Sequence, residues 1–109
     1  MNEQKIIELG EKQHFKLVLL YTHSRKPAKR AAAATALGKI RKDESFNQLT
    51  IMLRDSDLTV KTAAVNALSD MGRKNASEYI RHQMDTVKDP DFENVCKAAL
   101  VNISNNANT

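Results

Sequence analysis

The sequence repeats itself at an interval of 31 residues. Residues 30–40 read RAAAATALGKI and residues 61–71 read KTAAVNALSDM, so that the same small and large apolar residues recur in the same places. The shift also aligns two pairs upstream, Leu9 with Ile40 and Phe15 with Phe46. After a short insertion near 86–88, a shift of 35 yields a third copy. A period of roughly 20 to 50 residues is typical of solenoids and similar arrays, so we expect stacked units rather than one closed globule.

Each copy predicts two helices. The second helix of the middle copy has apolar residues at the i, i+3, i+4, i+7, i+8 and i+11 spacing of a helix packed on one side, namely Val60, Ala63, Ala64, Ala67, Leu68 and Met71. Alanine in such a stripe allows neighbouring helix axes to approach closely. The chain contains only 3 Gly and 2 Pro, too few for the many turns of an all-β fold. We therefore predict an all-α protein.

The predicted layout is one domain over residues 1–104, followed by a frayed tail at 105–109. A short helix at about 2–10 forms a half-repeat cap, and the repeats cover about 12–41, 42–72 and 73–104. Their helix pairs are expected at 12–23 and 26–41, 44–54 and 57–71, and 75–87 and 90–104. Side chains suited to cap helix starts are Ser45, Asp57, Asn75 and Asp89, and Gly72 suits a left-handed helix stop.

These residues resemble the HEAT-repeat family, in the short subtype first associated with phycobilisome lyase subunits. Asp55 and Asp57 precede Val60 and Lys61 and an alanine-rich helix, and the helix of the first copy ends in a Leu-Gly-Lys-Ile sequence at 37–40. The signature residues of tetratricopeptide and ankyrin repeats are missing. The resemblance implies a right-handed α-solenoid of about three helical hairpins plus an N-terminal capping helix. It also implies a structural ladder between repeats, in which Asp55 or Asp57 faces Lys61.

The resemblance further implies binding of other proteins through a concave face lined by the second helices. The exposed positions on those helices are small and mostly polar, which suits docking of a helix or loop better than chemistry. They are Ala31, Thr35, Lys39, Thr62, Asn66, Lys97 and Val101. We therefore expect a non-enzymatic adaptor or scaffold with an unknown protein partner.

The positive charge is concentrated in the first part of the chain. Residues 1–42 contain ten Lys or Arg against three acids, whereas residues 43–109 contain seven against ten. In the first repeat Ser24 and Lys26 stand where Asp55 and Asp57 stand in the second, which clusters Arg25, Lys26, Lys29 and Arg30 at a helix start. Positive charge there opposes the helix dipole. We interpret the cluster, extended by Lys39, Arg41 and Lys42, as a surface for an acidic partner; a merely solubilising surface remains the other interpretation.

Nucleic-acid binding through the same basic residues is the alternative function. It would make affinity fall steeply with salt, but the chain has 5% aromatic residues and no Trp to stack on bases. A homodimer is a further hypothesis, because the last helix has many apolar positions: Phe92, Val95, Leu100, Val101 and Ile103.

Sequence features of catalysis and metal binding are missing. His14, His23 and His82 lack metal-ligand spacing, and the single cysteine, Cys96, is expected to be a small packing residue. There is no glycine-rich phosphate loop. We predict no enzyme activity, no cofactor and no metal. The longest apolar run, 17–21, is too short for a signal sequence or a membrane span, which favours a cytoplasmic protein.

Overall fold

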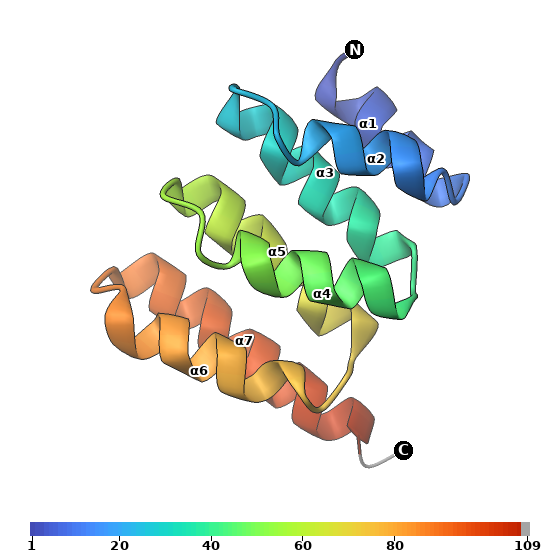
Figure 1. Ribbon diagram of the computed structural model, residues 1–109. Helices are drawn as coiled ribbons and strands as arrows, with labels where there is room; N and C mark the ends of the chain where they lie inside the picture. Colours follow the sequence, from blue (N-terminus) through green and yellow to red (C-terminus); the bar gives the residue numbers. More distant parts are fainter. Residues whose placement is uncertain (108–109) are drawn as a thin grey trace.

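The structure, a computed structural model, describes residues 1–107, and within that range it contains seven α-helices and no strand (Figure 1). The helices are α1 (Glu3–Glu11), α2 (Phe15–Tyr21), α3 (Pro27–Lys39), α4 (Asp43–Met52), α5 (Leu58–Met71), α6 (Ala76–Thr86) and α7 (Pro90–Ala107). Their order agrees with the predicted helix pairs, and α2 is shorter than the predicted 12–23. The all-α class is therefore confirmed.

The helices form two layers (Figure 1). Helices α1, α3, α5 and α7 stack side by side in the second-helix layer, and α2, α4 and α6 form the first-helix layer. Each helix of the first-helix layer packs against two neighbours of the other layer: α2 against α1 and α3, α4 against α3 and α5, and α6 against α5 and α7. This arrangement is an α-solenoid of three hairpins in which α1 caps one end of the second-helix layer.

The core runs continuously between the two layers. Its largest fully buried side chains include Ile6, Val18, Leu37, Leu49, Leu53, Val60, Leu68, Ile80, Phe92 and Ile103. Because no single hairpin can cover its own apolar stripe, stacking of the repeats supplies this core.

Three predicted helix ends are correct, whereas Asn75 precedes α6 without a capping hydrogen bond from its side chain. Asp57 accepts hydrogen bonds from the N–H groups of Thr59 and Val60, and Asp89 accepts one from Phe92, so both aspartates cap their helices. Gly72 ends α5 with a φ of 67°, the left-handed conformation that glycine adopts most easily.

Several boundaries differ from the prediction, and the start of α2 lies three residues later than expected. Helix α4 begins at Asp43, so Ser45 lies inside its first turn instead of capping it; acidic Asp43 and Glu44 favour the earlier start. Ser45 is buried, and its hydroxyl has no hydrogen-bond partner among the described residues. Helix α7 continues through residues 105–107, which were predicted to fray, and residues 108 and 109 lie outside the described range.

Two glycines allow the second helices to pack closely. A Cβ atom added to Gly10 would lie 2.5 Å from the carbonyl oxygen of Ala36, and one added to Gly38 would lie 2.9 Å from the Cβ of Ala67. Gly10 is thus equivalent to Gly38, a shift of 28 residues, so the alignment of Leu9 with Ile40 is wrong. The connections after α1 and after α3 have the same length, residues 12–14 and 40–42, and the difference of three residues lies in the helices that follow, since α2 has 7 residues and α4 has 10.

The contact between α5 and α7 is polar at the corresponding place. Ser69 replaces the glycine, and the side-chain amide of Asn102 donates hydrogen bonds to the Ser69 hydroxyl (2.9 Å) and carbonyl (3.1 Å). The first two contacts of the second-helix layer therefore depend on the absence of a side chain, and the third depends on hydrogen bonds.

Candidate interaction surface

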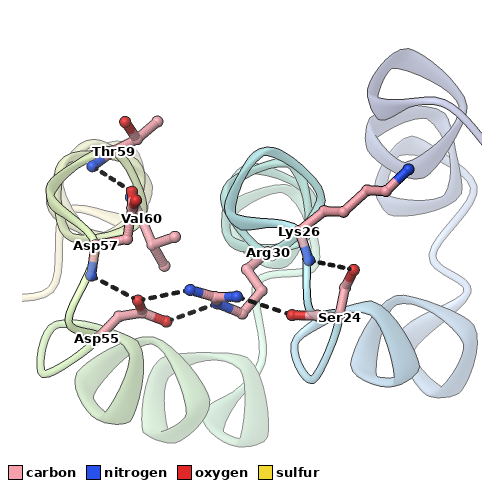
Figure 2. A network of polar contacts seen from close by, with 7 residues as sticks. All are labelled: Ser24, Lys26, Arg30, Asp55, Asp57, Thr59 and Val60. Carbon is pink, nitrogen blue, oxygen red and sulfur yellow. Dashed lines mark hydrogen bonds and ion pairs between the residues drawn. The ribbon is translucent and has the colours of Figure 1, made fainter.

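An ion pair joins the first repeat to the second. The Arg30 guanidinium donates two hydrogen bonds to the Asp55 carboxylate, from Nε to Oδ2 (2.9 Å) and from Nη2 to Oδ1 (3.1 Å), and a third to the carbonyl of Ser24 (2.9 Å) (Figure 2). Both side chains are mostly buried, with exposed fractions of 18% and 16%. Burial alone would raise the pKa of Asp55, but the hydrogen bond from Arg30, the Asp57 N–H and the charges of Arg30 and Lys61 together lower it.

The ladder between repeats thus exists, but the predicted partners need correction. Lys61 forms no ion pair with Asp55 or Asp57; its ammonium donates to the carbonyl of Leu53 (2.8 Å) and to the side-chain oxygen of Gln83 (2.7 Å). Burial lowers the pKa of Lys61, against a smaller opposing effect of the Asp55 charge. Arg30 and Lys61 are equivalent residues that each reach into the next repeat, so Arg30 belongs to the ladder and not to a free basic surface.

The start of α3 has the same local geometry as the start of α5 but a different charge. The N–H of Lys26 donates to the Ser24 hydroxyl (3.2 Å), as the N–H of Asp57 donates to the Asp55 carboxylate (2.9 Å). Asp57 then caps α5, whereas Lys26 offers no acceptor to α3. Figure 2 shows the Lys26 side chain pointing away from the Arg30–Asp55 pair.

Two further basic residues of the first half have structural contacts. Arg41 donates from its guanidinium to the carbonyls of Asp70 and Met71 (3.0 Å each) and so caps the end of α5. Its equivalent Gln13, whose φ is 63°, donates to the carbonyl of Lys39 at the end of α3 (2.9 Å). The ammonium of Lys42 lies 4.3 Å from the centre of the Phe15 ring, a cation–π contact.

The remaining cations of the predicted cluster form what we call the basic loop: Arg25, Lys26 and Lys29. Arg25 and Lys26 are exposed and Lys29 is half-buried, and no acidic side chain of residues 1–107 forms an ion pair with any of them. Lys39 lies at the other end of α3, about 18 Å away at the rise of an α-helix. Lys39, Arg41 and Lys42 therefore lie apart from the basic loop, and their part in binding stays a prediction.

The charge differs more between single repeats than between residues 1–42 and residues 43–109. Residues 12–42 contain nine Lys or Arg and no Asp or Glu, residues 43–72 contain two against five, and residues 73–104 contain five against five. No acid in the first repeat can neutralise the basic loop from within that repeat.

The predicted exposed positions of the second helices lie along α3, α5 and α7, and we call them the second-helix face. Ala31, Thr35 and Thr62 are half-buried, and the other members are exposed: Lys39, Asn66, Lys97 and Val101. Two of its seven members are charged, Lys39 and Lys97, and Lys97 is paired with Glu93 (3.0 Å). The face begins on α3 directly after the basic loop.

The apolar residues of α7 are mostly used in the core. Phe92 and Ile103 are buried, Val95 and Leu100 pack against the core, and only Val101 is largely exposed (61%). The hypothesis of a dimer through α7 therefore loses most of its apolar surface. Larger exposed apolar side chains lie on α2, where Leu17 and Leu20 are 47% and 68% exposed.

The described residues contain no cluster of three or more potential metal ligands. Cys96 is fully buried, as predicted for a packing residue, and burial, with a smaller contribution from Glu93, raises the pKa of its thiol to about 11. A groove of about 250 Å³ between α4 and α6 is lined by Thr50, Leu53, Arg54, Glu78, Tyr79, His82 and Gln83. Over residues 1–107, no helix combines the length and apolar character needed to span a bilayer.

Comparisons with known proteins agree with this geometry. A family model described as HEAT repeats matches residues 16–101, which covers α2 to α6 and most of α7. Searches of curated proteins and of solved structures find no match. Because the family match covers most of the chain and the helices stack in pairs as the family requires, this protein belongs to the HEAT-repeat family.

Proposed function

We propose that this protein is a non-enzymatic adaptor that binds an acidic surface of another protein through its basic loop and its second-helix face. HEAT repeats generally mediate protein–protein interactions. Stacked hairpins present a continuous outer surface to a partner, which favours binding of a macromolecule over catalysis.

The charge of the basic loop carries this proposal. Arg25, Lys26 and Lys29 lie at the N-terminal end of α3, where positive charge opposes the helix dipole and costs stability. By contrast, Arg30, Arg41 and Lys42 contact other repeats. Since the basic loop does not stabilise the fold, we assign it to binding of an acidic partner.

The position of the basic loop relative to α3 supports a single continuous binding site. Ala31 and Thr35 follow Lys29 along the same helix, within two turns. A partner segment that lies along α3 can therefore contact the second-helix face with its body and the basic loop with an acidic end.

A capture experiment with matched variants tests the proposal. We expect cross-linking in a lysate of the source cells to recover a protein with the wild type and to lose it with the Arg25→Ser, Lys26→Ser, Lys29→Ser triple variant. The control triple, Lys5→Ser, Lys74→Ser, Lys88→Ser, removes the same charge elsewhere and should still recover it. Asn66→Arg, which blocks the second-helix face, should also abolish capture. Equal recovery with every variant would contradict the proposal.

Nucleic-acid binding is the second candidate, favoured by the acid-free segment 12–42. Fluorescence anisotropy with a DNA duplex and a single-stranded RNA, at about 50 and 200 mM salt, separates the two functions. We expect no tight binding at either salt concentration. Tight binding that weakens steeply with salt would replace the adaptor proposal by a nucleic-acid-binding function.

A further inference from the structure

Helix α2 is apolar on nearly every side, although the protein covers it on one side only. Six of its seven residues, FKLVLLY, are apolar, and Lys16 is the exception. Val18 is buried, while Phe15, Leu19 and Tyr21 are half-buried. Leu17 and Leu20 remain 47% and 68% exposed. A helix that is apolar all round is normally buried all round, so α2 has more apolar surface than the fold uses.

The repeat shows which way the exposed leucines face. A shift of 31 aligns Leu17 with Gln48 and Tyr79, and Leu20 with Ile51 and His82. Tyr79 and His82 line the groove between α6 and the preceding helix α4, and the Tyr79 ring packs edge-on against Phe46 with centroids 6.4 Å apart. Leu17 and Leu20 therefore lie on the flank of α2 that corresponds to the wall of this groove, and their equivalents Ile51 and Tyr79 remain 61% and 45% exposed.

No helix precedes α2 in the first-helix layer within the described residues (Figure 1). Helix α1 caps only the second-helix layer, and its exposed positions are polar: Glu3, Gln4, Lys5 and Glu11. The N-terminal end of the solenoid is thus polar in one layer and apolar in the other.

The surrounding charge selects among the molecules that could cover this flank. Lys16 is exposed on α2, and Lys12 and Arg25 lie just before and after the helix, with no acid anywhere in residues 12–42. A second copy placed with its own α2 against this flank would bring like charges together. A partner with acidic residues beside an apolar stripe fits both features of the surface.

We propose that the α2 flank, formed by Lys16, Leu17 and Leu20, docks an amphipathic helix of a partner protein that carries Asp or Glu beside its apolar stripe. The docked helix covers Leu17 and Leu20 with its apolar stripe and places its acidic residues beside Lys16. This inference rests on the proposed adaptor function and adds a second surface to it, separate from the second-helix face.

A displayed library of helices tests this docking site. The library presents a fixed helical scaffold with one randomised face, selected on the wild-type protein. We expect the enriched helices to have apolar residues at i, i+3, i+4 and i+7 flanked by Asp or Glu. Their affinity should fall about tenfold or more for the Leu17→Ser, Leu20→Ser double variant, because two apolar contacts are lost. It should fall further for Lys16→Glu, while Ile51→Ser, the matched control on α4, leaves it unchanged.

Circular dichroism establishes that each variant is folded. If the double variant does not fold, the single variant Leu20→Ser is used in its place. The inference is overturned if no helix is enriched, or if the enriched helices bind the leucine variants as tightly as the wild type. A dimer in sedimentation that requires Leu17 and Leu20, or binding to phosphatidylserine vesicles that requires them, would assign the flank to a second copy or to a membrane surface instead. Helices that lose affinity only for the basic-loop triple variant would support the adaptor function and overturn this docking site.

Discussion

The first and third repeats share a backbone plan but differ in what their surfaces contain. In the third repeat, Asp89 caps α7, α6 is amphipathic, and acids and bases balance over residues 73–104. In the first repeat, Lys26 stands at the start of α3, α2 is apolar on nearly all sides, and residues 12–42 contain no acid. The third repeat contains what stacking requires, and the extra cations and leucines of the first are features that stacking does not require.

The largest expected effect concerns the close contact between Gly10 of α1 and Ala36 of α3. In Gly10→Ala the new Cβ meets the backbone of Ala36, so α1 must move away from α3. We expect a loss of about 3 kcal/mol in the free energy of unfolding. Urea unfolding measures it. The matched change in the third repeat, Ser69→Ala, removes one hydrogen bond with Asn102 and should cost about 1 kcal/mol. Equal costs would mean that the two contacts do not differ as described.

The partly buried ion pair between Arg30 and Asp55 ranks next. Asp55→Asn removes the negative charge that holds Arg30, and we expect a loss of about 2 kcal/mol at pH 7. Asp43→Asn is the control, because Asp43 is 86% exposed in its ion pair with Arg73 and should contribute less than about 0.5 kcal/mol. Urea unfolding of both variants measures the difference, and comparable losses would contradict the structural role of the Arg30–Asp55 pair.

The same pair predicts a pH dependence. Folding lowers the pKa of Asp55, so its contribution is fully present above the ordinary carboxyl pKa of about 4 and is lost as the pH falls through the lower folded pKa. The pH range from 5 to 2 extends from about one unit above to about two units below the ordinary carboxyl pKa. Over this range the free energy of unfolding of the wild type should fall more than that of Asp55→Asn. Urea unfolding at each pH measures these free energies. If they fall in parallel for the two proteins, Asp55 does not cause the loss of stability in acid.

Exchanging the capping residues of two repeats should stabilise the first repeat and destabilise the third. Lys26→Asp places in α3 the acceptor that Asp57 provides in α5, and we expect a gain of about 1 kcal/mol. Asp89→Lys should cost about 1 kcal/mol in α7. Thermal unfolding of both variants measures these shifts. A loss of stability in Lys26→Asp would mean that Lys26 makes a structural contribution that the geometry does not explain.

The smallest expected effect concerns the cation–π contact between Lys42 and Phe15 of the first repeat. Lys42→Gln should cost about 0.5 kcal/mol, because the ammonium lies over Phe15 at an exposed site. Repeating the change in a Phe15→Leu background should cost nothing, which a double-mutant cycle by urea unfolding measures. A coupling energy of zero would remove this contact from the account.

The repeat in the sequence predicted much of the fold, because the apolar period of each helix is local information. It indicated the paired helices, the caps at Asp57 and Asp89 and the equivalence of Ser24 and Lys26 with Asp55 and Asp57. The contacts between repeats were harder to predict. Arg30 and Asp55 are 25 residues apart in the chain. Asp55 and Asp57 also lie close to Lys61 in the sequence, so the sequence alone does not say whether Asp55 pairs with Arg30 or with Lys61. The way in which the helices of neighbouring repeats are rotated against each other decides this pairing.

The candidate site was predicted in part. The basic loop was found because its charge breaks the repeat, but Arg30 was included since a ladder residue and a free cation look alike in sequence. Gln83 has no sequence signal that marks it as a partner of Lys61. The exposed flank of α2 was missed because an apolar run such as 17–21 reads as core unless the neighbouring helices are known.

The central claim is that the basic loop serves binding and contributes nothing to folding. Its most direct test is the free energy of unfolding of the Arg25→Ser, Lys26→Ser, Lys29→Ser variant, measured in urea at low salt. The account predicts a stability equal to or higher than that of the wild type, because unfavourable charge is removed from the start of α3. A loss of more than about 1 kcal/mol, the scale of a helix cap, would contradict it.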